Sequence, residues 1–521
     1  MRWRHLRWIR RTVQLIALIG TLWLLRHATQ MDEGFALAAP VALPFSLDPL
    51  VALAQLAGGG WSWLLWPALV TAASALLVGR FFCGWLCPLG ACLDGAGACA
   101  APLRRRLPSA RVVEAVRGLR WMLLIAVPLA AALGLHLIGW VDPFALLYRG
   151  LNALDPLLRQ GADVGSMWVA DHAPGWIAGP VEWTYQVADR HLLGREDRAV
   201  ALAGWSVALL GGVFALELVA SRGWCRIACP LGALLGLIGR RALLARLPRQ
   251  GCGGCTACAT ACPQGAFDDQ RRLRVETCTM CGDCLAACPG NRAALSLSVA
   301  PPAAPLDVSR RLFLGGAASG LALPLVARIP ALRRPEVLPE RLLRPPGVVE
   351  EADFAARCVR CGACIQACPT GALQPIALEA GLDGVYTPAL RPRRGACEAN
   401  CTRCGEVCPT GAIPRLDLTA KLAVPLGVAA IDRTTCLPWA TGETCLVCEE
   451  HCPVSPKAIT RVARRHGTVE APVIDSDACI GCGWCERVCP LEVSAILVYR
   501  PGRAPAGSCT TCPGGACRTC P

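Results

Sequence analysis

Hydrophobic residues gather in long stretches over the first 240 positions of the chain. About 20 consecutive apolar residues are needed for a helix to cross the hydrocarbon core of a bilayer. Four stretches approach that length, and we expect each to form a membrane-spanning helix; they lie at residues 12–30, 61–79, 121–141 and 199–219. Arg26 and His27 interrupt the first stretch near its end.

The charged residues between these stretches predict how the helices would be oriented. Arginines collect at the N-terminus, at 104–120 and at 222–249, whereas the segments 31–60 and 142–198 mix acidic and basic residues. Because basic loops stay on the cytoplasmic side of a membrane, the three basic segments are expected inside. Membrane topology therefore explains the net charge of +14, and no basic stripe interleaved with aromatic residues indicates a nucleic-acid partner.

The stretch SRRLFLGGAASGLALPLVA at residues 309–327 combines two arginines with a run of small and apolar residues. This pattern is typical of a twin-arginine export signal, which normally opens a protein. We expect residues 312–330 to form a fifth span that leaves the following part of the chain on the outer side. Arg328, Arg333 and Arg334 after this span oppose the charge trend of the other loops.

The first 240 residues also contain a repeat. Each half has a predicted span, an Asp-Pro pair, a second span and a Cys-x-x-x-Cys-Pro motif. Repeated membrane units often form a site where they meet, so the four thiols are expected to lie together at the inner face, holding a cluster or relaying electrons to one. The alternative is that they pack helix ends, because buried cysteine behaves as a small hydrophobe. The repeated residues are Asp48, Cys83 and Cys87 in the first half, and Asp142, Cys225 and Cys229 in the second.

The number and spacing of the cysteines are the most informative features of the sequence. The chain has 521 residues, is 54% hydrophobic and contains 34 cysteines. Two runs within residues 241–300 have the spacing C-x2-C-x2-C-x3-C-P, which is typical of bacterial [4Fe–4S] sites. In such runs three cysteines wrap one cubane and the fourth binds the neighbouring cluster. The runs predict a double-cluster module held by Cys252, Cys255, Cys258 and Cys262 together with Cys278, Cys281, Cys284 and Cys288.

Four further runs lie within residues 346–500. Two keep the strict spacing, one has a three-residue first gap and one an eight-residue first gap. Six clusters are therefore expected in all, and the repeated spacing disfavours zinc or disulfides. The four runs are Cys358, Cys361, Cys364 and Cys368; Cys397, Cys401, Cys404 and Cys408; Cys436, Cys445, Cys448 and Cys452; and Cys479, Cys482, Cys485 and Cys489.

The remaining candidate ligands receive no catalytic role. The tail at 501–521 holds Cys509, Cys512, Cys517 and Cys520, for which a metal site and a pair of disulfides are equally open. Cys92 and Cys99 have no partner at metal spacing and are expected to be structural. His136 is interpreted as a satisfied helix residue.

Several iron–sulfur clusters in one chain indicate transfer of single electrons. No haem, flavin or nicotinamide motif is present in the sequence. A membrane-dissolved two-electron donor is then needed, and quinol is the natural candidate substrate. Quinol oxidation releases protons, so Asp48 and Asp142 are candidate catalytic residues near the outer face. Asp-Pro pairs are also common turn formers, which leaves a structural role open.

Two known groups resemble the two parts of the chain. Residues 1–300 look like NapH-type membrane quinol dehydrogenase ferredoxins. Residues 309–500 resemble the NapG type of the MauN/NapG family, twin-arginine-exported ferredoxins with four [4Fe–4S] clusters. The second resemblance is carried by SRRLFL, CVRCGACIQACPTGAL, CEANCTRCGEVCPTGAI, CLPWATGETCLVCEEHCPV and CIGCGWCERVCPLEVSAI.

The resemblance implies that electrons pass from the membrane quinol pool to a periplasmic reductase or cytochrome, often a nitrate reductase. It also explains an export signal in mid-chain, because two proteins that are ordinarily separate are joined here. Thiolates meant for iron are oxidised in a disulfide-forming compartment, so export of an already folded domain is expected. The joined chain and the extra tail cysteines depart from the family pattern and leave the acceptor open.

The expected architecture is a polytopic α-helical membrane domain, with four spans plus a fifth linking span, and α+β double-cluster ferredoxin modules. Its parts are the membrane domain at 1–240, a cytoplasmic module at 241–300, a linker at 301–345, a periplasmic four-cluster domain at 346–500 and the tail. The expected location is the bacterial inner membrane. Two other functions remain open, namely maturation or regulation of a metalloenzyme such as a copper enzyme, and a structural anchor for a reductase.

Overall fold

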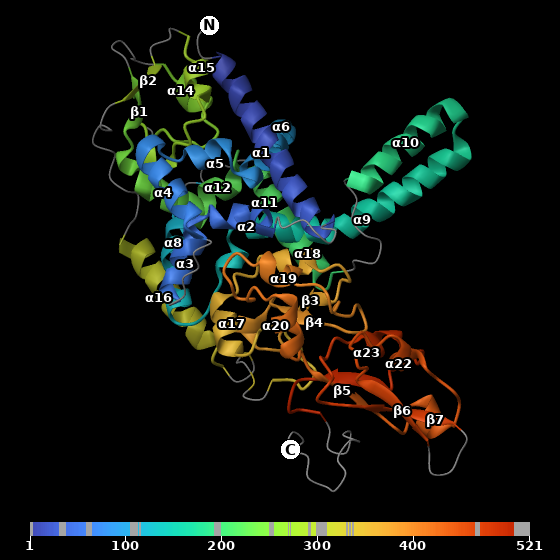
Figure 1. Ribbon diagram of the computed structural model, residues 1–521. Coiled ribbons are helices and arrows are strands. Elements are labelled where there is room, and N and C mark those ends of the chain that lie inside the picture. Colours follow the sequence, from blue (N-terminus) through green and yellow to red (C-terminus); the bar gives the residue numbers. More distant parts are fainter. Residues whose placement is uncertain are drawn as a thin grey trace.

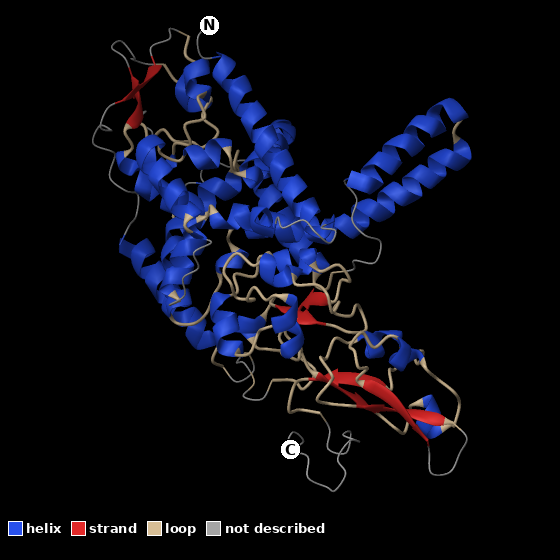
Figure 2. Cartoon of the chain, in the orientation of Figure 1, coloured by secondary structure: helices blue, strands red, loops and turns tan. Residues whose placement is uncertain are grey.

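Helices fill the middle of the molecule, and short strands lie at its two ends (Figures 1 and 2). The computed structural model describes residues 4–30, 38–58, 65–104, 113, 116–191, 200–248, 255–268, 270, 272–289, 293–297, 310–329, 332, 335, 338–463 and 469–504. The tail cysteines Cys509, Cys512, Cys517 and Cys520 lie outside the described residues, as does Cys252.

The helical part is built from the repeat that the sequence indicates. Each half has a leading helix, a helix that begins at the proline of an Asp-Pro pair, an apolar helix, a five-residue helix and a helix that begins at the proline of Cys-Pro. In the first half these are α1 (Arg4–Gln30), α3 (Pro49–Ala57), α4 (Pro67–Val78), α5 (Phe81–Trp85) and α6 (Pro88–Arg104). In the second they are α8 (Leu119–Ala132), α9 (Pro143–His172), α11 (Ala203–Val219), α12 (Gly223–Ile227) and α13 (Pro230–Ile238).

The expected four-span membrane domain is wrong. Among the described residues one helical segment, His5–Leu25 in α1, is long and apolar enough to cross a bilayer. Helices α4, α8 and α11 contain 12, 14 and 17 residues, which is short of the length that a span needs. The expected fifth span fails in the same way, because α16 (Arg310–Val326) has 17 residues.

The hydrophobic stretches overestimated helix length because apolar residues continue through the turns that bound the helices. Gly79 ends α4 with a φ of +71°, and Gly134 follows α8 with a φ of +88°. Leu202, at the start of α11, has a φ of +59°, so the helix begins after it. The segments expected to be outer loops are largely helical, with α2 (Ala38–Ser46), α3, the start of α9 and the projecting hairpin of α9 and α10 (Gly175–His191) (Figure 1).

A small α+β module at residues 244–297 forms one end of the molecule. Strand β1 (Leu244–Pro248) pairs antiparallel with β2 (Ala293–Leu297), and the cysteine runs lie between them with helices α14 (Ala257–Thr260) and α15 (Asp283–Ala286). Helix α1 contacts α15 near its start and α18 (Ala363–Ala367) of the C-terminal domain near its end. Its 27 residues correspond to about 40 Å, so α1 connects the two ends of the molecule.

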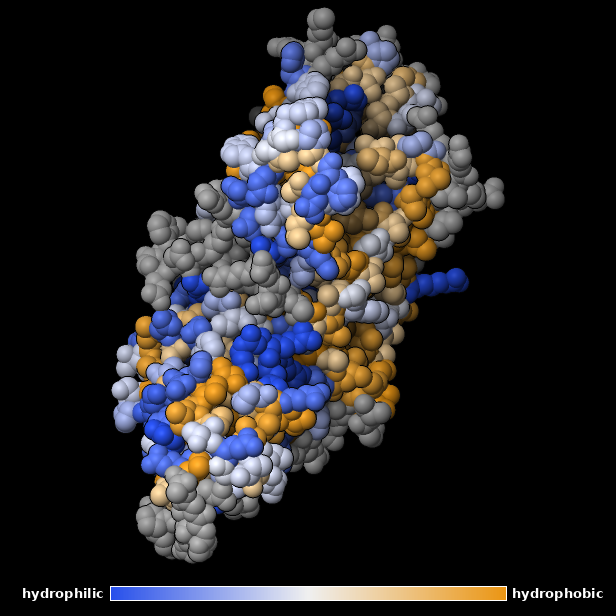
Figure 3. All heavy atoms as spheres, turned by 90° about the vertical axis from the view of Figure 1, so that its right-hand side faces the viewer, coloured by the Kyte–Doolittle hydropathy of each residue, from blue (hydrophilic) through white to orange (hydrophobic). Residues whose placement is uncertain are grey.

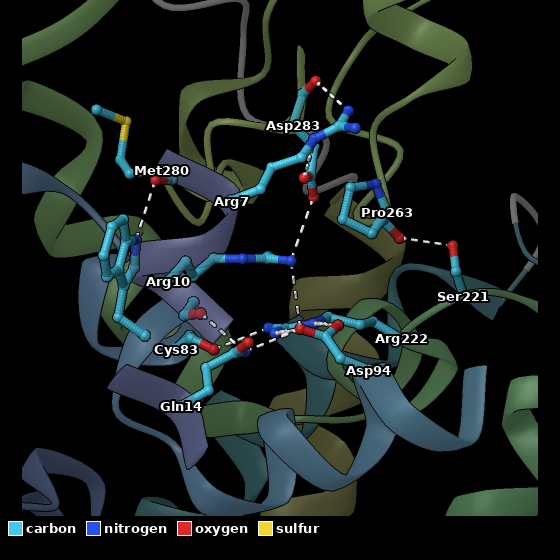
Figure 4. A network of polar contacts seen from close by, with 12 residues as sticks. Arg7, Arg10, Gln14, Cys83, Asp94, Ser221, Arg222, Pro263, Met280 and Asp283 are labelled. Atoms are coloured by element: carbon cyan, nitrogen blue, oxygen red, sulfur yellow. Dashed lines mark hydrogen bonds and ion pairs between the residues drawn. The ribbon is translucent and has the colours of Figure 1, made fainter. Parts of the chain in front are cut away.

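An ion-pair network fixes α1 to this module (Figure 4). Arg7 Nε lies 3.0 Å from Asp283 Oδ1, and Arg10 lies between Asp283 and Asp94 of α6. Gln14 donates to Asp94 at 2.8 Å, and both nitrogens of the Arg222 fork donate to the same carboxylate at 2.7 Å. The network therefore connects α1, α6, the module and the second half of the repeat.

The other end is a domain at residues 338–504 with two-stranded sheets. Strands β3 (Leu373–Pro375) and β4 (Pro388–Leu390) belong to its first unit, which also contains α17 (Glu351–Arg357), α18 and α19 (Arg403–Glu406). In the second unit β5 (Val428–Ile431) pairs with β8 (Ile496–Tyr499), and β6 (Ile459–Ala463) with β7 (Glu470–Ile474). Its helices are α20 (Leu418–Ala423), α21 (Leu437–Ala440), α22 (Val447–Glu450) and α23 (Trp484–Val488).

This C-terminal domain packs directly on the helical part. Gln55 of α3 donates to the Arg357 carbonyl at 2.8 Å, and Ser206 of α11 donates to the Tyr386 hydroxyl at 3.0 Å. A Cβ on Gly139 would come within 2.2 Å of the Val359 carbonyl oxygen, so glycine permits this close approach. The first cysteine run of the domain, which begins at Cys358, therefore lies at the interface.

Exposed apolar side chains gather along one side of the molecule (Figure 3). Large exposed residues lie on α1, α9 and α10: Trp8, Leu15, Ile16, Trp23, Leu157, Leu158, Met167, Trp168, Trp176 and Trp183. A surface of this kind is typical of contact with a membrane or a protein partner.

Candidate metal centres

The first run of the C-terminal domain forms a pocket with one cysteine from the second run. Cys358, Cys361, Cys364 and Cys408 line it together with apolar side chains such as Phe354 and Ile413. We call these four cysteines the first set. The chain folds in this way because the run crosses over: Cys368, which ends the first run, leaves for the neighbouring site and Cys408 takes its place.

Backbone conformation shapes this loop and recurs in two other runs. The residue before the second cysteine and the residue after it both have positive φ. In the first set these are Arg360 at +54° and Gly362 at +80°. Met280 and Gly282, and Gly481 and Gly483, repeat the pattern. Left-handed arginine and methionine are strained, and such strain is typical of functional loops.

The second set consists of Cys368, Cys397, Cys401 and Cys404. These thiols are close enough for each to act electrostatically on the others. Burial raises the pKa of Cys397 to about 11, and that of Cys404 more strongly. The looser spacing of this run therefore does not prevent four thiols from meeting.

The second unit repeats the exchange. Cys452, Cys479, Cys482 and Cys485 line one pocket and form the third set. Cys436, Cys445, Cys448 and Cys489 line another pocket and form the fourth set. Thus the eight-residue first gap between Cys436 and Cys445 closes around the same kind of site.

The four sets lie in a row. First and second sets are neighbours because they exchange Cys368 and Cys408, and third and fourth sets are neighbours because they exchange Cys452 and Cys489. The two units meet where the Cys397 amide donates to the Cys482 carbonyl at 2.8 Å. The order along the domain is therefore first, second, third and fourth.

At the other end of the molecule, the module builds one set within the described residues. Cys262, Cys278, Cys281 and Cys284 line its pocket. The Cys258 thiol lies 3.7 Å from the Cys284 carbonyl oxygen, so the other run is adjacent. Cys255 belongs to that run, and Cys288, which ends the run of Cys278, is the described cysteine left over for its cluster.

The structure brings together Cys83, Cys87, Cys225 and Cys229, which we call the four-thiol centre. All four are buried. Burial raises the pKa of each of Cys87, Cys225 and Cys229, to about 11 for Cys225, and the neighbouring thiols of the centre raise it further. The centre borders the module, since the Trp85 indole donates to the Met280 carbonyl at 3.1 Å.

Two buried arginines surround the four-thiol centre. Each stands three residues before the first cysteine of its repeat, and each reaches the other repeat. Arg222 donates to the Cys83 carbonyl at 2.8 Å, and a Cβ on Gly90 would lie 3.4 Å from its Nη1. Arg80 is so close to Gly232 that a Cβ there would come within 2.3 Å of its Nη2. The Arg-x-x-Cys spacing in both repeats is the sequence signal that marks these two arginines.

Asp48 and Asp142 also meet, and they are fully buried. Each caps a helix: Asp48 Oδ1 accepts from the Leu50 amide at 2.7 Å, and Asp142 Oδ2 from the Ala145 amide at 2.7 Å. Their other oxygens, Asp48 Oδ2 and Asp142 Oδ1, have no other donor among the described residues. The two carboxyls are close enough for each to act on the other electrostatically, and two carboxyls in such contact can share one proton.

Burial raises the pKa of both carboxyls, and the charge of Asp142 raises that of Asp48 further. We call these residues the acid pair. The Arg149 guanidinium acts on Asp142 in the opposite direction, and the Asp142 carboxyl acts in turn on Cys361 of the first set. Both carboxyls thus cap helices at their Asp-Pro turns and also interact with each other at the interface.

Further buried polar groups surround the same interface. Tyr148 is 2% exposed, its hydroxyl has no partner among the described residues, and burial raises its pKa. His136 was expected to be a satisfied helix residue, but it follows α8 in a loop and neither ring nitrogen has a partner in the described structure. Burial lowers its pKa to about 4, so the ring is neutral.

The cysteine sets fit [4Fe–4S] clusters by donor type and grouping. Each of the four pockets is lined by four thiols and apolar side chains, and cubanes are held by four thiolates. Within the described residues, no three Cys, His, Asp or Glu side chains are grouped in the way that a single metal ion requires.

Comparison with known families gives the same chemistry. A family described as "4Fe-4S binding domain" matches residues 60–109 and 202–249, which contain the four-thiol centre. Two families described as "4Fe-4S dicluster domain" match residues 244–289 and 357–412, and another "4Fe-4S binding domain" family matches residues 472–493. No solved structure matches the chain.

Identity to curated relatives shows the family to which the chain belongs. The ferredoxin-type protein NapG of Escherichia coli K12 is 39% identical over 193 residues, which cover 35% of this chain and 79% of NapG. MauM of Methylorubrum extorquens, a methylamine utilization ferredoxin-type protein, is 37% identical over 225 residues, covering 39% of this chain and 98% of MauM. The chain belongs to the NapG/MauM family of ferredoxin-type proteins.

A NapH-like part accompanies this NapG/MauM-type ferredoxin. NapH of Haemophilus influenzae is 28% identical over 262 residues, which cover 47% of this chain and 73% of NapH. Matches to both NapG and NapH confirm the predicted resemblance to a fusion of the two. The chain is therefore an iron–sulfur electron-transfer protein with several [4Fe–4S] domains.

Proposed function

We propose that the chain oxidises quinol and passes the electrons to a reductase of the nitrate-reductase type or to a cytochrome. The observation that carries the proposal is the acid pair beside the first of four cysteine sets in a row. Clusters bound to these sets would supply single-electron transfer. The chain's own residues then hold the protons, exclude water and orient the charges.

The acid pair supplies the proton chemistry. Oxidation of a quinol releases two electrons and two protons. With one proton shared, the pair has one remaining negative charge and accepts one proton from the quinol hydroxyl. It returns that proton to water before it accepts the second. Arg149 offsets the charge of the pair, and burial raises the pKa of both carboxyls, which favours a form that keeps a proton.

The four-thiol centre is proposed to hold a further cluster. Four buried thiols meet where the two halves of the repeat join, and two buried arginines offset the negative charge of bound thiolates. Together with the module, this would provide cluster sites on the side of the acid pair opposite to the C-terminal domain. The count expected from the sequence is then six clusters plus this one.

A bacterial inner membrane is the proposed location. The exposed tryptophans and aliphatic side chains of α1, α9 and α10 suit contact with a bilayer, in which quinols dissolve. The Arg310–Arg311 pair at the start of α16 supports export of the C-terminal domain to the periplasm. Accessibility of an introduced cysteine at Val493, which is 80% exposed, to an impermeant thiol reagent in intact cells tests this placement.

A role in metalloenzyme maturation or regulation is the alternative function. It predicts slow or absent quinol oxidation. The row of four complete cysteine sets favours the electron-transfer function, because a sensor or assembly factor does not need a chain of sites. The rate of quinol oxidation therefore distinguishes the two functions.

The test is rapid mixing of the anaerobic, iron-loaded full chain with a short-chain quinol. Bleaching of cluster absorbance reports reduction. We expect Asp142→Asn to slow it about 100-fold or more, because loss of a positioned proton acceptor typically costs this much. Asp417→Asn is the control, since Asp417 caps α20 at the surface in the same way. Equal rates in the parent and Asp142→Asn would refute the role of the acid pair, and no reduction of the parent would refute quinol as the donor.

A further inference from the structure

Helix α20 buries its charge and exposes its leucines. It has six residues, and Lys421 is its only buried residue, at 5% exposure. Leu418 and Leu422 on the same helix are 45% and 44% exposed. Burying an ammonium group is costly unless polar partners compensate it, so the orientation of this helix needs a cause.

The partners of the ammonium group are backbone carbonyls of the second cysteine run. Lys421 Nζ donates to the Cys401 carbonyl at 2.6 Å and the Ala399 carbonyl at 3.3 Å, and it also donates to the Glu398 carbonyl. These acceptors satisfy its donors but carry no net charge. Among the ion pairs of the described residues none involves Lys421, so the contacts that hold its ammonium group are these carbonyls.

That charge is directed at one cysteine set. The Lys421 ammonium acts electrostatically on Cys397, Cys401 and Cys404, which are three of the four thiols of the second set. A buried charge is screened much less than a surface charge, because little water lies between it and the site. Lys457, the only other lysine in the sequence, is exposed and donates to the Glu449 carbonyl at 2.9 Å.

We propose that Lys421 is a positioning residue that raises the reduction potential of the cluster held by Cys368, Cys397, Cys401 and Cys404. Reduction adds a negative charge to a cluster, and a fixed positive charge nearby stabilises the reduced form. A cluster at the second site would then accept electrons more readily at the junction of the two units. The proposal depends on cluster binding and not on the identity of the electron donor.

The test is a redox titration of the full chain followed by low-temperature EPR. Lys421→Gln keeps N–H donors for the carbonyls and removes the charge. We expect one reduction wave to move to lower potential, by about tenfold in the one-electron equilibrium constant or about 59 mV, and the other waves to stay. Lys421→Arg restores the charge and should restore the wave. Lys457→Met, which removes an exposed charge, should leave every wave in place.

Iron content and melting temperature separate this role from a structural one. A Lys421→Gln protein with full iron content and unchanged waves would overturn the proposal. Loss of one cluster's iron in Lys421→Gln would also overturn it, because the lysine would then serve to hold the 398–401 loop. A shift of all reduction waves together would also overturn it, because the substitution would then have changed the domain as a whole and not one cluster site.

Discussion

Several buried arginine and lysine side chains lie beside the cysteine sets and the acid pair. Arg80 and Arg222 lie against the four-thiol centre, Arg149 lies beside the acid pair, and Lys421 lies beside the second cysteine set. The sequence could indicate Asp48 and Asp142 because they repeat, and the structure places them in contact. It could not indicate Lys421, because a single lysine in an apolar helix is ordinarily expected to face solvent.

Asp48→Asn should remove part of the pH dependence of stability. Both carboxyls have a pKa above the ordinary value near 4, so their contribution to the free energy of unfolding is present below about pH 4 and falls as pH rises through the pKa of the folded state. The melting temperature of the variant relative to the parent should therefore be higher at pH 8 than at pH 5. Asp417→Asn, at an exposed cap, should show no such trend. A constant difference for Asp48→Asn would contradict the shared proton.

Elements were harder to predict than sites. Hydrophobic stretches at 121–141 and 199–219 predicted long spans, but a turn at Gly134 divides the first and a turn at Leu202 shortens the second at its start. The residues of these turns are as apolar as those of the helices, so composition carries no sign of where each helix begins or ends. In contrast, spacing and not hydrophobicity defines the cysteine runs, and described cysteines of these runs line common pockets.

Helix α16 packs closely on α8, and two neighbouring glycines of α16 differ in how close they come to it. A Cβ on Gly316 would come within 2.9 Å of the Met122 carbonyl oxygen, whereas a Cβ on Gly315 would meet only the flexible Met122 sulfur at 3.6 Å. We expect Gly316→Ala to lower the free energy of unfolding by about 1–3 kcal/mol through overpacking. Gly315→Ala should raise it by about 0.5–1 kcal/mol, because alanine favours helix. Melting of both variants checks this pair, and equal effects would show that α16 does not pack closely on α8.

The whole molecule places cysteine sets at both ends of a helical middle part. One face of the middle part carries the module and the four-thiol centre, and the other carries the C-terminal domain with the acid pair at the interface. The sequence predicted the resemblance to a fusion, which the relatives confirm. It did not predict that the two parts pack together, because the interface forms from Gln55, Gly139 and Ser206, which no motif marks.

Removing one site from the row of four cysteine sets tests the proposed route of the electrons most directly. Cys401→Ser removes one ligand of the second set, and iron analysis of the purified full chain verifies the loss of that cluster. After rapid mixing with quinol, freeze-quench EPR should show reduction of the cluster in the first set and persistent oxidation of those in the third and fourth sets, while dithionite still reduces all of them. Reduction of the third and fourth sets by quinol at the parent rate would contradict the row as the route of the electrons.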